Sequence, residues 1–385
     1  MMEIIPKIEM SALWAQYLKI RDEIDNAILE VIHSSVFVKG GKVIEFERHL
    51  GEYLGTGVTG CGNGTDALQL AFMALDLRPG DEVITTPFTF IATVEVLALL
   101  HLKPVFVDVN PATFQMEVTG IGDAVTERTR AILPVHLFGQ NACMEEILEI
   151  AQHHQLSVVE DAAQSIGADY IFRNGDVKKS GTMGIIGCTS FFPSKTLGAF
   201  GDGGAVLTSD PGLASVIRSI ANHGMQVRYQ YERIGINSRL DSLQAAILDV
   251  KLKYLDHYIQ ARQEAAKWYD SHLDGTGDIV LPARVPASTH TFHQYTILTS
   301  YRDKLKDFLK VHGIPSMVYY PRAVHLQEAY EYLGYRKGDF PVTEQLTETV
   351  LSLPMHTELD ESQLEYITGI VRKFFNNPEY RSGIS

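Results

Sequence analysis

The chain alternates between short apolar runs and longer stretches in which apolar residues recur every three or four positions. From about residue 56, four runs rich in β-branched residues have the length of strands: residues 82–86, 104–109, 131–136 and 157–161. Helical periodicity fills the intervals between them. Strands without polar alternation are buried on both faces, as in parallel sheets. The pattern therefore predicts an α/β fold with a mostly parallel sheet wrapped by helices.

A second, smaller domain is predicted toward the C-terminus. Residues 242–273 are rich in Leu, Ala, Gln and Lys and contain no Pro or Gly, so one long helix is expected to bridge two domains. We place the division near residue 255, with residues 1–254 forming an N-terminal segment and the large domain, and residues 255–385 forming a small α/β domain. The other expected elements are helices at 65–77, 91–100, 144–154 and 301–312, strands at 188–192, 203–208 and 293–298, a strand and loop at 278–286, and an N-terminal helix around 14–32 that packs near the small domain.

Composition narrows the possible functions. The 385 residues are 45% hydrophobic and carry a formal net charge of −14, which disfavours nucleic-acid binding because that needs a clustered basic surface. The start of the chain lacks an apolar signal segment, and apolar stretches elsewhere are too short for membrane spans. The three cysteines are too isolated for a disulfide framework or a metal site. We expect a cytoplasmic protein with no metal, no membrane partner and no nucleic-acid partner.

The first candidate site is Gly-Cys-Gly-Asn-Gly-Thr-Asp-Ala-Leu at residues 60–68. Glycines let the backbone approach a ligand closely, and the N-terminus of the following helix offers unpaired N–H groups to a phosphate. The same sequence also fits an ordinary turn before a helix. Thr65 stands where the dinucleotide-binding fingerprint has its third glycine, so a nicotinamide dehydrogenase is disfavoured.

Two further candidates follow predicted strands. Asp161 ends a buried run, where α/β sheets bind ligands, and Gln164 lies three residues later on the same helical face. Adjacent Glu160 would point elsewhere, so Asp161 is the candidate, although an acid here also fits a helix cap. Lys195 lies between an aromatic run and the glycines at residues 201–204. Such surroundings lower the pKa of an ammonium group, as a Schiff-base lysine requires, whereas most lysines are solvated surface groups.

Together, the three sites match one cofactor. Pyridoxal phosphate requires a lysine for covalent attachment, an acid for its pyridinium nitrogen and a helix N-terminus for its phosphate. The chain carries them in the order phosphate loop, acid, lysine. We therefore predict a pyridoxal-phosphate-dependent enzyme in which Lys195 carries the cofactor.

The sequence resembles the nucleotide-sugar aminotransferases of the DegT family, which have the aspartate aminotransferase-like fold known as PLP fold type I. One branch of that family has histidine in place of the lysine and dehydrates its substrate, so Lys195 indicates transamination. The resemblance runs from residue 40 almost to the C-terminus. Its motifs include Gly-Gly-Lys-Val-Ile-Glu-Phe-Glu at 40–47, Gly-Thr-Asp-Ala-Leu at 64–68, Pro-Val-His-Leu-Phe-Gly-Gln at 134–140, Glu-Asp-Ala-Ala-Gln at 160–164, Phe-Pro-Ser-Lys at 192–195, Asn-Ser-Arg-Leu-Asp at 237–241 and Leu-Ser-Leu-Pro-Met at 351–355.

The resemblance implies a role for each matching residue. Lys195 would form the Schiff base and shuttle a proton, Asp161 would pair with the pyridine nitrogen, and Gln164 would bind the ring hydroxyl. Phe90 would stack on the ring, with Phe88 as the alternative; ordinary core packing is the other reading for both. The cofactor phosphate would be bound by Thr65, Asp66, Ser190 and Asn237, the last coming from the partner subunit of a homodimer with shared active sites.

The resemblance also implies a substrate. Residues 61–69, 188–195 and 235–241 are most similar to family members that aminate UDP-2-acetamido-2-deoxy-3-keto-glucuronic acid for surface polysaccharides. The amino donor would be an amino acid, and L-glutamate is the one expected. The alternatives are a dTDP-linked 3- or 4-keto-6-deoxyhexose or a keto-inositol as acceptor, and a non-catalytic regulator with the same fold.

Three residues are candidates for sugar recognition. Arg239 would pair with the uronate carboxylate, unless it forms a structural ion pair with Asp241 or Glu232. Tyr319 and Tyr320 would contact the sugar, in a Val-Tyr-Tyr-Pro sequence that departs from the family's His-Tyr-Pro.

Overall fold

A seven-stranded sheet forms the centre of the computed structural model, which describes residues 7–381. Residues 1–6, part of the start in which no signal segment is expected, lie outside this range. The strand order is β1-β9-β8-β5-β4-β2-β3. β9 is antiparallel to both of its neighbours and the other pairs are parallel, so the predicted mostly parallel sheet is confirmed. The strands are β1 (Gly57–Cys61), β2 (Glu82–Thr85), β3 (Lys103–Phe106), β4 (Thr129–Ile132), β5 (Ser157–Asp161), β8 (Ile186–Ser190) and β9 (Gly204–Thr208).

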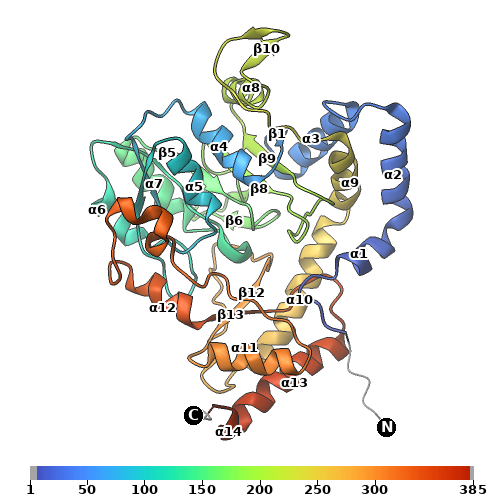
Figure 1. Cartoon of the computed structure of the whole chain (residues 1–385), viewed down its shortest axis with the longest axis vertical. Helices are drawn as coiled ribbons and strands as arrows, with labels where there is room; N and C mark the ends of the chain where they lie inside the picture. Colours follow the sequence, from blue (N-terminus) through green and yellow to red (C-terminus); the bar gives the residue numbers. More distant parts are fainter. Residues whose placement is uncertain (1–6, 382–385) are drawn as a thin grey trace.

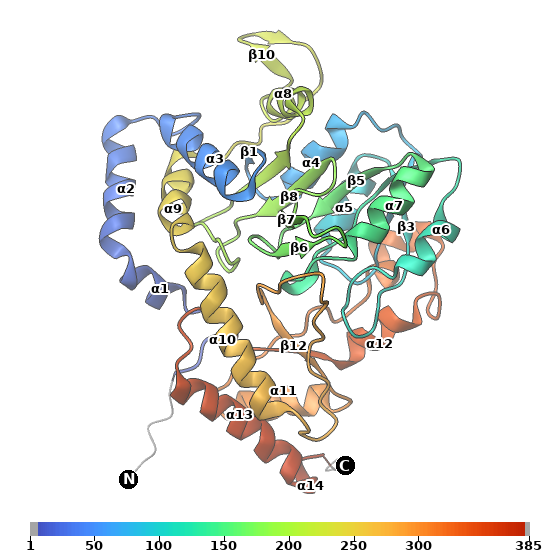
Figure 2. The same ribbon diagram turned by 180° about the vertical axis from the view of Figure 1, so that it is seen from behind.

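Helices cover both faces of this sheet (Figures 1 and 2). Val159 packs with α4, α5 and α8 on one face, while its neighbour Val158 packs with α7 on the other. Strands buried on both sides explain the absence of polar alternation in the sequence. The helices are α1 (Leu13–Lys19), α2 (Arg21–Ser34), α3 (Gly41–Leu54), α4 (Gly64–Ala74), α5 (Ala92–Leu99), α6 (Ile121–Ala124), α7 (Met144–His154), α8 (Pro211–Ile220), α9 (Ser242–Leu252), α10 (Leu255–Leu273), α11 (Arg302–Val311), α12 (Pro341–Thr349), α13 (Glu361–Asn376) and α14 (Pro378–Arg381).

The predicted long helix is wrong in one respect, because it is two helices. α9 ends at Leu252 and α10 begins at Leu255. At the break, Lys253 Nζ lies 3.3 Å from Glu23 Oε2 of α2, and the hydroxyl of Tyr254 donates to the same carboxylate. Both contacts come from a distant part of the chain. The local sequence has no Pro or Gly at the break and therefore could not reveal it.

The predicted N-terminal helix is also divided, at Ile20 (φ −125°). Beyond the break, Ile24 of α2 packs on Ile247 and Val250 of α9. Before it, Gln16 Nε2 donates to Thr357 Oγ1 at 3.1 Å. The N-terminal helices therefore contact both the sheet-bearing part and the C-terminal part of the chain.

The C-terminal part has a core of its own. It is built around fully buried Tyr269, Tyr295 and Leu353, with β12 (Tyr295–Leu298) antiparallel to β13 (Val350–Leu353). The strand predicted at residues 278–286 is wrong, because only the bridge between Val280 and Leu298 forms. Prolines at positions 282 and 286 lack the N–H groups that a longer ladder would need.

The segment before α12 returns to the large sheet. Val324, Tyr330 and Phe340 pack against Val94 and Phe106 beside β3. The C-terminal part thus supplies side chains to the same end of the sheet at which β5 stops. The domain division near residue 255 stays a prediction.

The hairpin of β10 (Met225–Val227) and β11 (Gln230–Tyr231) projects from one end of the molecule, and α13 and α14 lie at the opposite end (Figures 1 and 2). α10 runs between the two ends. The remaining hairpin consists of β6 (Asp169–Ile171) and β7 (Val177–Lys179). Within residues 7–381, no helix combines the length and the apolar character that crossing a bilayer requires.

Candidate active site

The glycine-rich loop leads into the N-terminus of α4. Asn63 caps the helix, with its Oδ1 accepting from the backbone N–H of Asp66 at 2.8 Å. The N–H groups of Gly64 and Thr65 are in the first turn, where no intrahelical acceptor exists. Two of the four residues predicted to bind the phosphate lie here: Thr65 offers an amide free of intrahelical bonds, whereas the amide of Asp66 is occupied by the cap.

The carboxylate of Asp66 is also engaged. Its Oδ2 accepts from Ser238 Oγ at 2.6 Å, and Ser238 Oγ accepts in turn from the Gly62 N–H at 2.9 Å. Ser238 therefore ties the segment at residues 237–241 to the glycine-rich loop of the same chain. Sequence reasoning missed this contact, because the residues are far apart in the chain.

The start of α4 is pressed against the end of β8. A Cβ atom added to Gly64 would lie 2.7 Å from Ser190 Cβ and 3.1 Å from Ser190 Oγ. On the other side, a Cβ on Gly204 would lie 2.3 Å from the Asn63 carbonyl oxygen. Only glycine fits these positions, and the close approach brings the Ser190 hydroxyl beside the first N–H groups of α4. The arrangement fits a small anion such as a phosphate group.

Asp161 lies at the carboxyl end of β5 and is 6% exposed. Its Oδ2 accepts from Thr93 Oγ1 at 2.8 Å, and its Oδ1 accepts from the Ala163 N–H at 3.2 Å. Burial raises the pKa of Asp161, while these two donors and the positive charge of Lys195 oppose the rise. Sequence reasoning missed the role of Thr93, which lies on α5.

Glu160 points to the other side of β5 and is fully buried. Its Oε2 lies 2.8 Å from His136 Nε2 and accepts from the Gly181 N–H at 2.9 Å. Because His136 Nδ1 accepts from the Ala142 N–H at 3.1 Å, the ring hydrogen is on Nε2 and is donated to Glu160. Glu160 is thus committed to internal hydrogen bonds, which leaves Asp161 as the acid that faces the site.

Lys195 lies in the turn that follows β8. The turn is closed by hydrogen bonds from the Lys195 N–H to the Phe192 carbonyl and from the Ala199 N–H to the Phe191 carbonyl, both 2.8 Å. Burial lowers the pKa of Lys195 to about 8, and the charge of Asp161 acts in the opposite direction. Lys195 and Asp161 therefore act on each other across one shared space, and a large fraction of Lys195 is neutral near pH 8.

An aromatic and amide wall completes this space. Gln164 Nε2 donates to the Tyr320 hydroxyl at 3.1 Å, and Gln164 Oε1 accepts from the Phe138 N–H at 2.8 Å. Phe90 is 54% exposed, with its ring 6.2 Å from that of Tyr320, whereas Phe88 is 1% exposed and packs on Phe138. Phe88 is a core residue, and Phe90 is the aromatic side chain free to meet a ligand.

The Val-Tyr-Tyr-Pro segment brings the C-terminal part to the site. Val318, Tyr319 and Tyr320 pack on the apolar cluster that includes Phe88. The ring of half-buried Tyr319 lies 5.9 Å from that of Tyr320. Tyr320 is hydrogen-bonded to Gln164, and Tyr319 reaches this wall through its contact with Tyr320.

Asn237 and Arg239 lie on the segment that follows the projecting hairpin. Asn237 is exposed, and half-buried Arg239 donates from Nη1 to Asn222 Oδ1 at 3.4 Å. Among residues 7–381, Arg239 forms no ion pair with Asp241 or Glu232, the partners that a structural role would require. No acidic side chain of the described residues forms an ion pair with its guanidinium.

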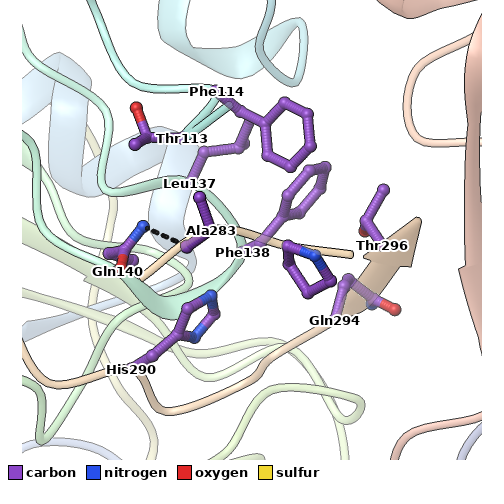
Figure 3. Close-up of a pocket in the computed structure, with 10 residues that line it drawn as sticks. Thr113, Phe114, Leu137, Phe138, Gln140, Ala283, His290, Gln294 and Thr296 are labelled. Carbon is purple, nitrogen blue, oxygen red and sulfur yellow. Dashed lines mark hydrogen bonds between the residues drawn. The ribbon is translucent and has the colours of Figure 1, made fainter. Parts of the chain in front are cut away.

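A small cavity shown in Figure 3 is lined by none of the predicted site residues. It holds about 10 Å³, the space of roughly one water molecule. Gln140 Nε2 bonds the Ala283 carbonyl at 3.2 Å along its wall. A sugar does not fit there. The residues around it are Thr113, Phe114, Leu137, Phe138, Gln140, Pro282, Ala283, His290, Gln294 and Thr296.

Residues 18–372 match the model of the DegT/DnrJ/EryC1/StrS aminotransferase family. The chain belongs to this family. The match covers the lysine, the acid, the glycine-rich loop and the C-terminal segment that together form the site. The expected fold and the expected pyridoxal-phosphate-dependent aminotransferase activity are thereby confirmed.

Three relatives align over almost the whole chain. A "pleiotropic regulatory protein" of Geobacillus stearothermophilus is 45% identical over 97% of this chain and 99% of its own length. A UDP-N-acetyl-3-dehydro-alpha-D-glucosamine 3-aminotransferase of Acidithiobacillus ferrooxidans is 44% identical, with coverages of 95% and 97%. A UDP-2-acetamido-2-deoxy-3-oxo-D-glucuronate aminotransferase of Pseudomonas aeruginosa is 42% identical, with coverages of 94% and 98%.

Solved structures agree with this family and fold. DesV of Streptomyces venezuelae, solved with a ketimine intermediate, superimposes with a TM-score of 0.93 at 38% identity, covering 97% of this chain and 99% of DesV. NtdA of Bacillus subtilis, solved with the cofactor PMP, has a TM-score of 0.84 at 30% identity, with coverages of 92% and 82%. The α4 N-terminus, Ser190, Asp161 and Lys195 of this chain fit such a cofactor, since they supply an anion cradle, an acid and a weakly basic amine.

Proposed function

We propose that this chain transfers an amino group from L-glutamate to a UDP-linked 3-keto sugar, with UDP-2-acetamido-2-deoxy-3-keto-glucuronic acid as the preferred acceptor. The observation that carries the chemistry is the pairing of Lys195, whose pKa is lowered to about 8, with buried Asp161. The acceptor is supported by the names of the Acidithiobacillus and Pseudomonas relatives, which both act on UDP-linked 3-keto sugars.

Each residue has a distinct task in this proposal. Lys195 would hold the cofactor covalently and, once released, would carry a proton on Nζ from the donor's Cα to the cofactor in the first half-reaction, and from the cofactor to the keto carbon of the sugar in the second. Asp161 keeps the pyridine nitrogen protonated. Bound pyridoxal phosphate supplies the electron sink that makes the Cα proton acidic. Gln164 bonds the ring hydroxyl, and Phe90 covers one face of the ring.

Phosphate binding is assigned to the cradle at α4. The first turn of α4 contributes the N–H groups of Gly64 and Thr65, and Ser190 lies directly against Gly64. The Asp66 carboxylate is held by Ser238, so its charge is stabilised beside the phosphate rather than facing it unpaired. In this proposal Asp66 holds the glycine-rich loop in place, and Thr65 and Ser190 bind the phosphate.

Arg239 favours the uronate over a neutral sugar. Its guanidinium lacks an acid partner in the described chain, and an uncompensated charge at a ligand site suits a carboxylate. Lys39 lies close enough to feel this charge. Burial lowers the pKa of Lys39, and the positive charge of Arg239 lowers it further. Two neighbouring cations create a positive region for an anionic substrate. Tyr319 and Tyr320 would line the sugar side, and a dTDP-linked 3- or 4-keto-6-deoxyhexose is the alternative acceptor.

The active unit in this proposal is a cytoplasmic homodimer with shared sites, in which Asn237 and Arg239 complete the partner's site. Apolar exposure supports an assembly, because Tyr229, Tyr231 and Ile234, in and beside the hairpin, are 72%, 62% and 88% exposed. Mixing Lys195→Ala chains with Asn237→Asp chains should restore activity, since one site of each mixed dimer carries neither lesion. Copurification of two tags verifies the mixing. Verified mixed dimers without activity would show that Asn237 serves its own chain.

The name of the Geobacillus relative raises a regulatory role as a second candidate. A non-catalytic regulator has no need of the complete set of Lys195, Asp161, Gln164 and an anion cradle. The catalytic proposal is therefore preferred. Mass spectrometry of the reaction products distinguishes the two roles, because only an enzyme converts the keto sugar into an amino sugar.

The direct test supplies purified holoenzyme with L-glutamate and a panel of nucleotide keto-sugars, and identifies products by mass spectrometry. The panel contains the UDP-linked uronate, its neutral N-acetylglucosamine counterpart and a dTDP-linked keto-deoxyhexose. Amination of the uronate with the highest kcat/KM is expected, with Lys195→Ala as the inactive control. A higher kcat/KM for the dTDP sugar would overturn the acceptor assignment.

A further inference from the structure

Thr93 is the buried hydroxyl behind the acid of the site. It lies on α5, is 0% exposed, and donates from Oγ1 to Asp161 Oδ2 at 2.8 Å. Thr89, 3% exposed, lies with its Oγ1 2.8 Å from Thr93 Oγ1. Because a hydroxyl has one hydrogen and Thr93 gives it to an ionised Asp161, Thr89 must donate to Thr93. The two threonines thus form a directed chain that ends on the carboxylate.

The Thr89–Thr93 pair supplies one of the two hydrogen bonds that the Asp161 carboxylate receives within the described residues. The other donor is the Ala163 N–H, at 3.2 Å to Oδ1, which no side-chain substitution removes. Thr93 is therefore the one side chain in residues 7–381 that donates to Asp161. With each oxygen held by one donor, the carboxylate keeps a fixed plane and retains lone pairs for a ligand.

The surroundings of Asp161 affect the balance between its protonated and its ionised form. Lys195 acts on Asp161 as a positive group, whereas the neutral His136 ring is held by Glu160. Cys188 and Tyr320 also lie within its electrostatic reach, but burial raises the pKa of both, so they stay neutral. Burial favours the protonated carboxyl, and hydrogen bonds to the charged form oppose it. Removing one of two donors should shift this balance.

We propose that Thr93 is a positioning residue that keeps Asp161 ionised and oriented toward the cofactor's pyridine nitrogen, with Thr89 fixing the direction of the Thr93 hydroxyl. The inference rests on the proposed function, since it requires Asp161 to meet that nitrogen. A carboxyl that keeps its own proton cannot hold the ring nitrogen protonated. Catalysis should then weaken even though every residue that touches the cofactor is intact.

The test compares Thr93→Val, which removes the hydroxyl at nearly constant shape, with Thr93→Ser, which retains it. Thr93→Val should lower kcat by about ten- to a hundredfold, the effect of losing one bond to a charged group, with little change in KM for the nucleotide sugar. Thr93→Ser should recover most of the loss. Thr89→Val should give a smaller decrease of the same kind.

A spectroscopic titration separates this role from simple packing. Loss of positive charge on the ring makes the nitrogen that links it to Lys195 easier to protonate, so the visible band of the bound cofactor should titrate at higher pH in Thr93→Val. In the Asp161→Asn background, Thr93→Val should produce no further shift in this titration. A shift that persists there, or a Thr93→Val band that titrates as in the wild type, would overturn the inference.

Failure of the proposed function looks different. If the wild-type protein forms no visible cofactor band on Lys195, the proposed function itself is wrong. If the wild type forms the band but Thr93→Val and Thr89→Val leave its titration and kcat unchanged, only the role of Thr93 is wrong. Should Thr93→Val not fold, Thr89→Val gives the same titration readout with a smaller expected shift, while Thr93→Ser should titrate near the wild type. An unchanged titration in Thr89→Val would then overturn the inference.

Discussion

Replacing Gly64 with alanine should damage cofactor binding without touching any residue that reacts. The added Cβ would lie 2.7 Å from Ser190 Cβ and 3.1 Å from its hydroxyl oxygen, well inside van der Waals contact. Either the α4 N-terminus or the end of β8 must move. Overpacking of this kind costs about 1–3 kcal/mol of folding free energy.

The larger effect should be on the phosphate cradle. A displaced α4 N-terminus weakens at least one hydrogen bond to a charged group, which is worth about 1.5–3 kcal/mol, so the Kd for pyridoxal phosphate should rise about ten- to a hundredfold. Fluorescence titration of cofactor-free protein measures the Kd, and thermal unfolding of the same protein measures the stability loss.

A matched control exists in the same chain. Gly41 is also the first residue of a helix, α3, but a Cβ there meets no atom within 4 Å. Gly41→Ala should therefore leave both the cofactor Kd and the melting temperature near their wild-type values. If Gly64→Ala binds the cofactor as tightly as Gly41→Ala does, the argument that α4 and β8 form the phosphate cradle is refuted.

The remaining predictions concern the substrate, the aromatic wall and the lysine. Arg239→Ala should raise the KM for the uronate far more than for its neutral counterpart, because a lost charge-assisted contact costs on the order of 2–5 kcal/mol; an equal loss on both would contradict the role in carboxylate binding. Phe90→Ala should weaken cofactor binding with little change in the free energy of unfolding, whereas Phe88→Ala should cost about 3–5 kcal/mol of stability. Cofactor titration and chemical denaturation measure the two effects. If Phe88→Ala weakened cofactor binding and Phe90→Ala lowered stability instead, the two assignments would be reversed. Cofactor uptake by the apo-protein, followed by absorbance, should speed up as pH rises, with a midpoint near the Lys195 pKa of about 8, because only the neutral amine attacks the aldehyde. A midpoint near that of an ordinary lysine would show that Lys195 is not desolvated.

Much of the fold follows from local patterns. The runs that became β2, β5 and β8 have no polar alternation, because helices bury both faces of the sheet. The choice of Asp161 over Glu160 also follows locally, because successive residues of a strand point to opposite faces. Glu160 indeed turns away to His136.

The errors and omissions have a common physical origin. The break before Leu255 is accompanied by contacts to Glu23 of α2, more than two hundred residues earlier in the chain. Thr93 reaches Asp161 across 68 positions of sequence, and Ser238 reaches Asp66 across 172. Contacts of this range leave no periodicity or spacing in the sequence. Motifs could therefore nominate Lys195 and Asp161 as candidates, but they could not reveal the side chains packed behind them.

The central claim is that Lys195 carries the cofactor, and one chemical measurement tests it most directly. Reduction of the yellow holoenzyme with borohydride fixes the cofactor to the amine that holds it, and mass spectrometry of the digest locates the adduct. Lys251 is the sharpest rival, because burial also lowers its pKa to about 8 and its Nζ lies 2.5 Å from the Gly198 carbonyl oxygen in the same turn. The account predicts a single adduct on the peptide that contains Lys195. An adduct on Lys251, or on any other lysine, would contradict it.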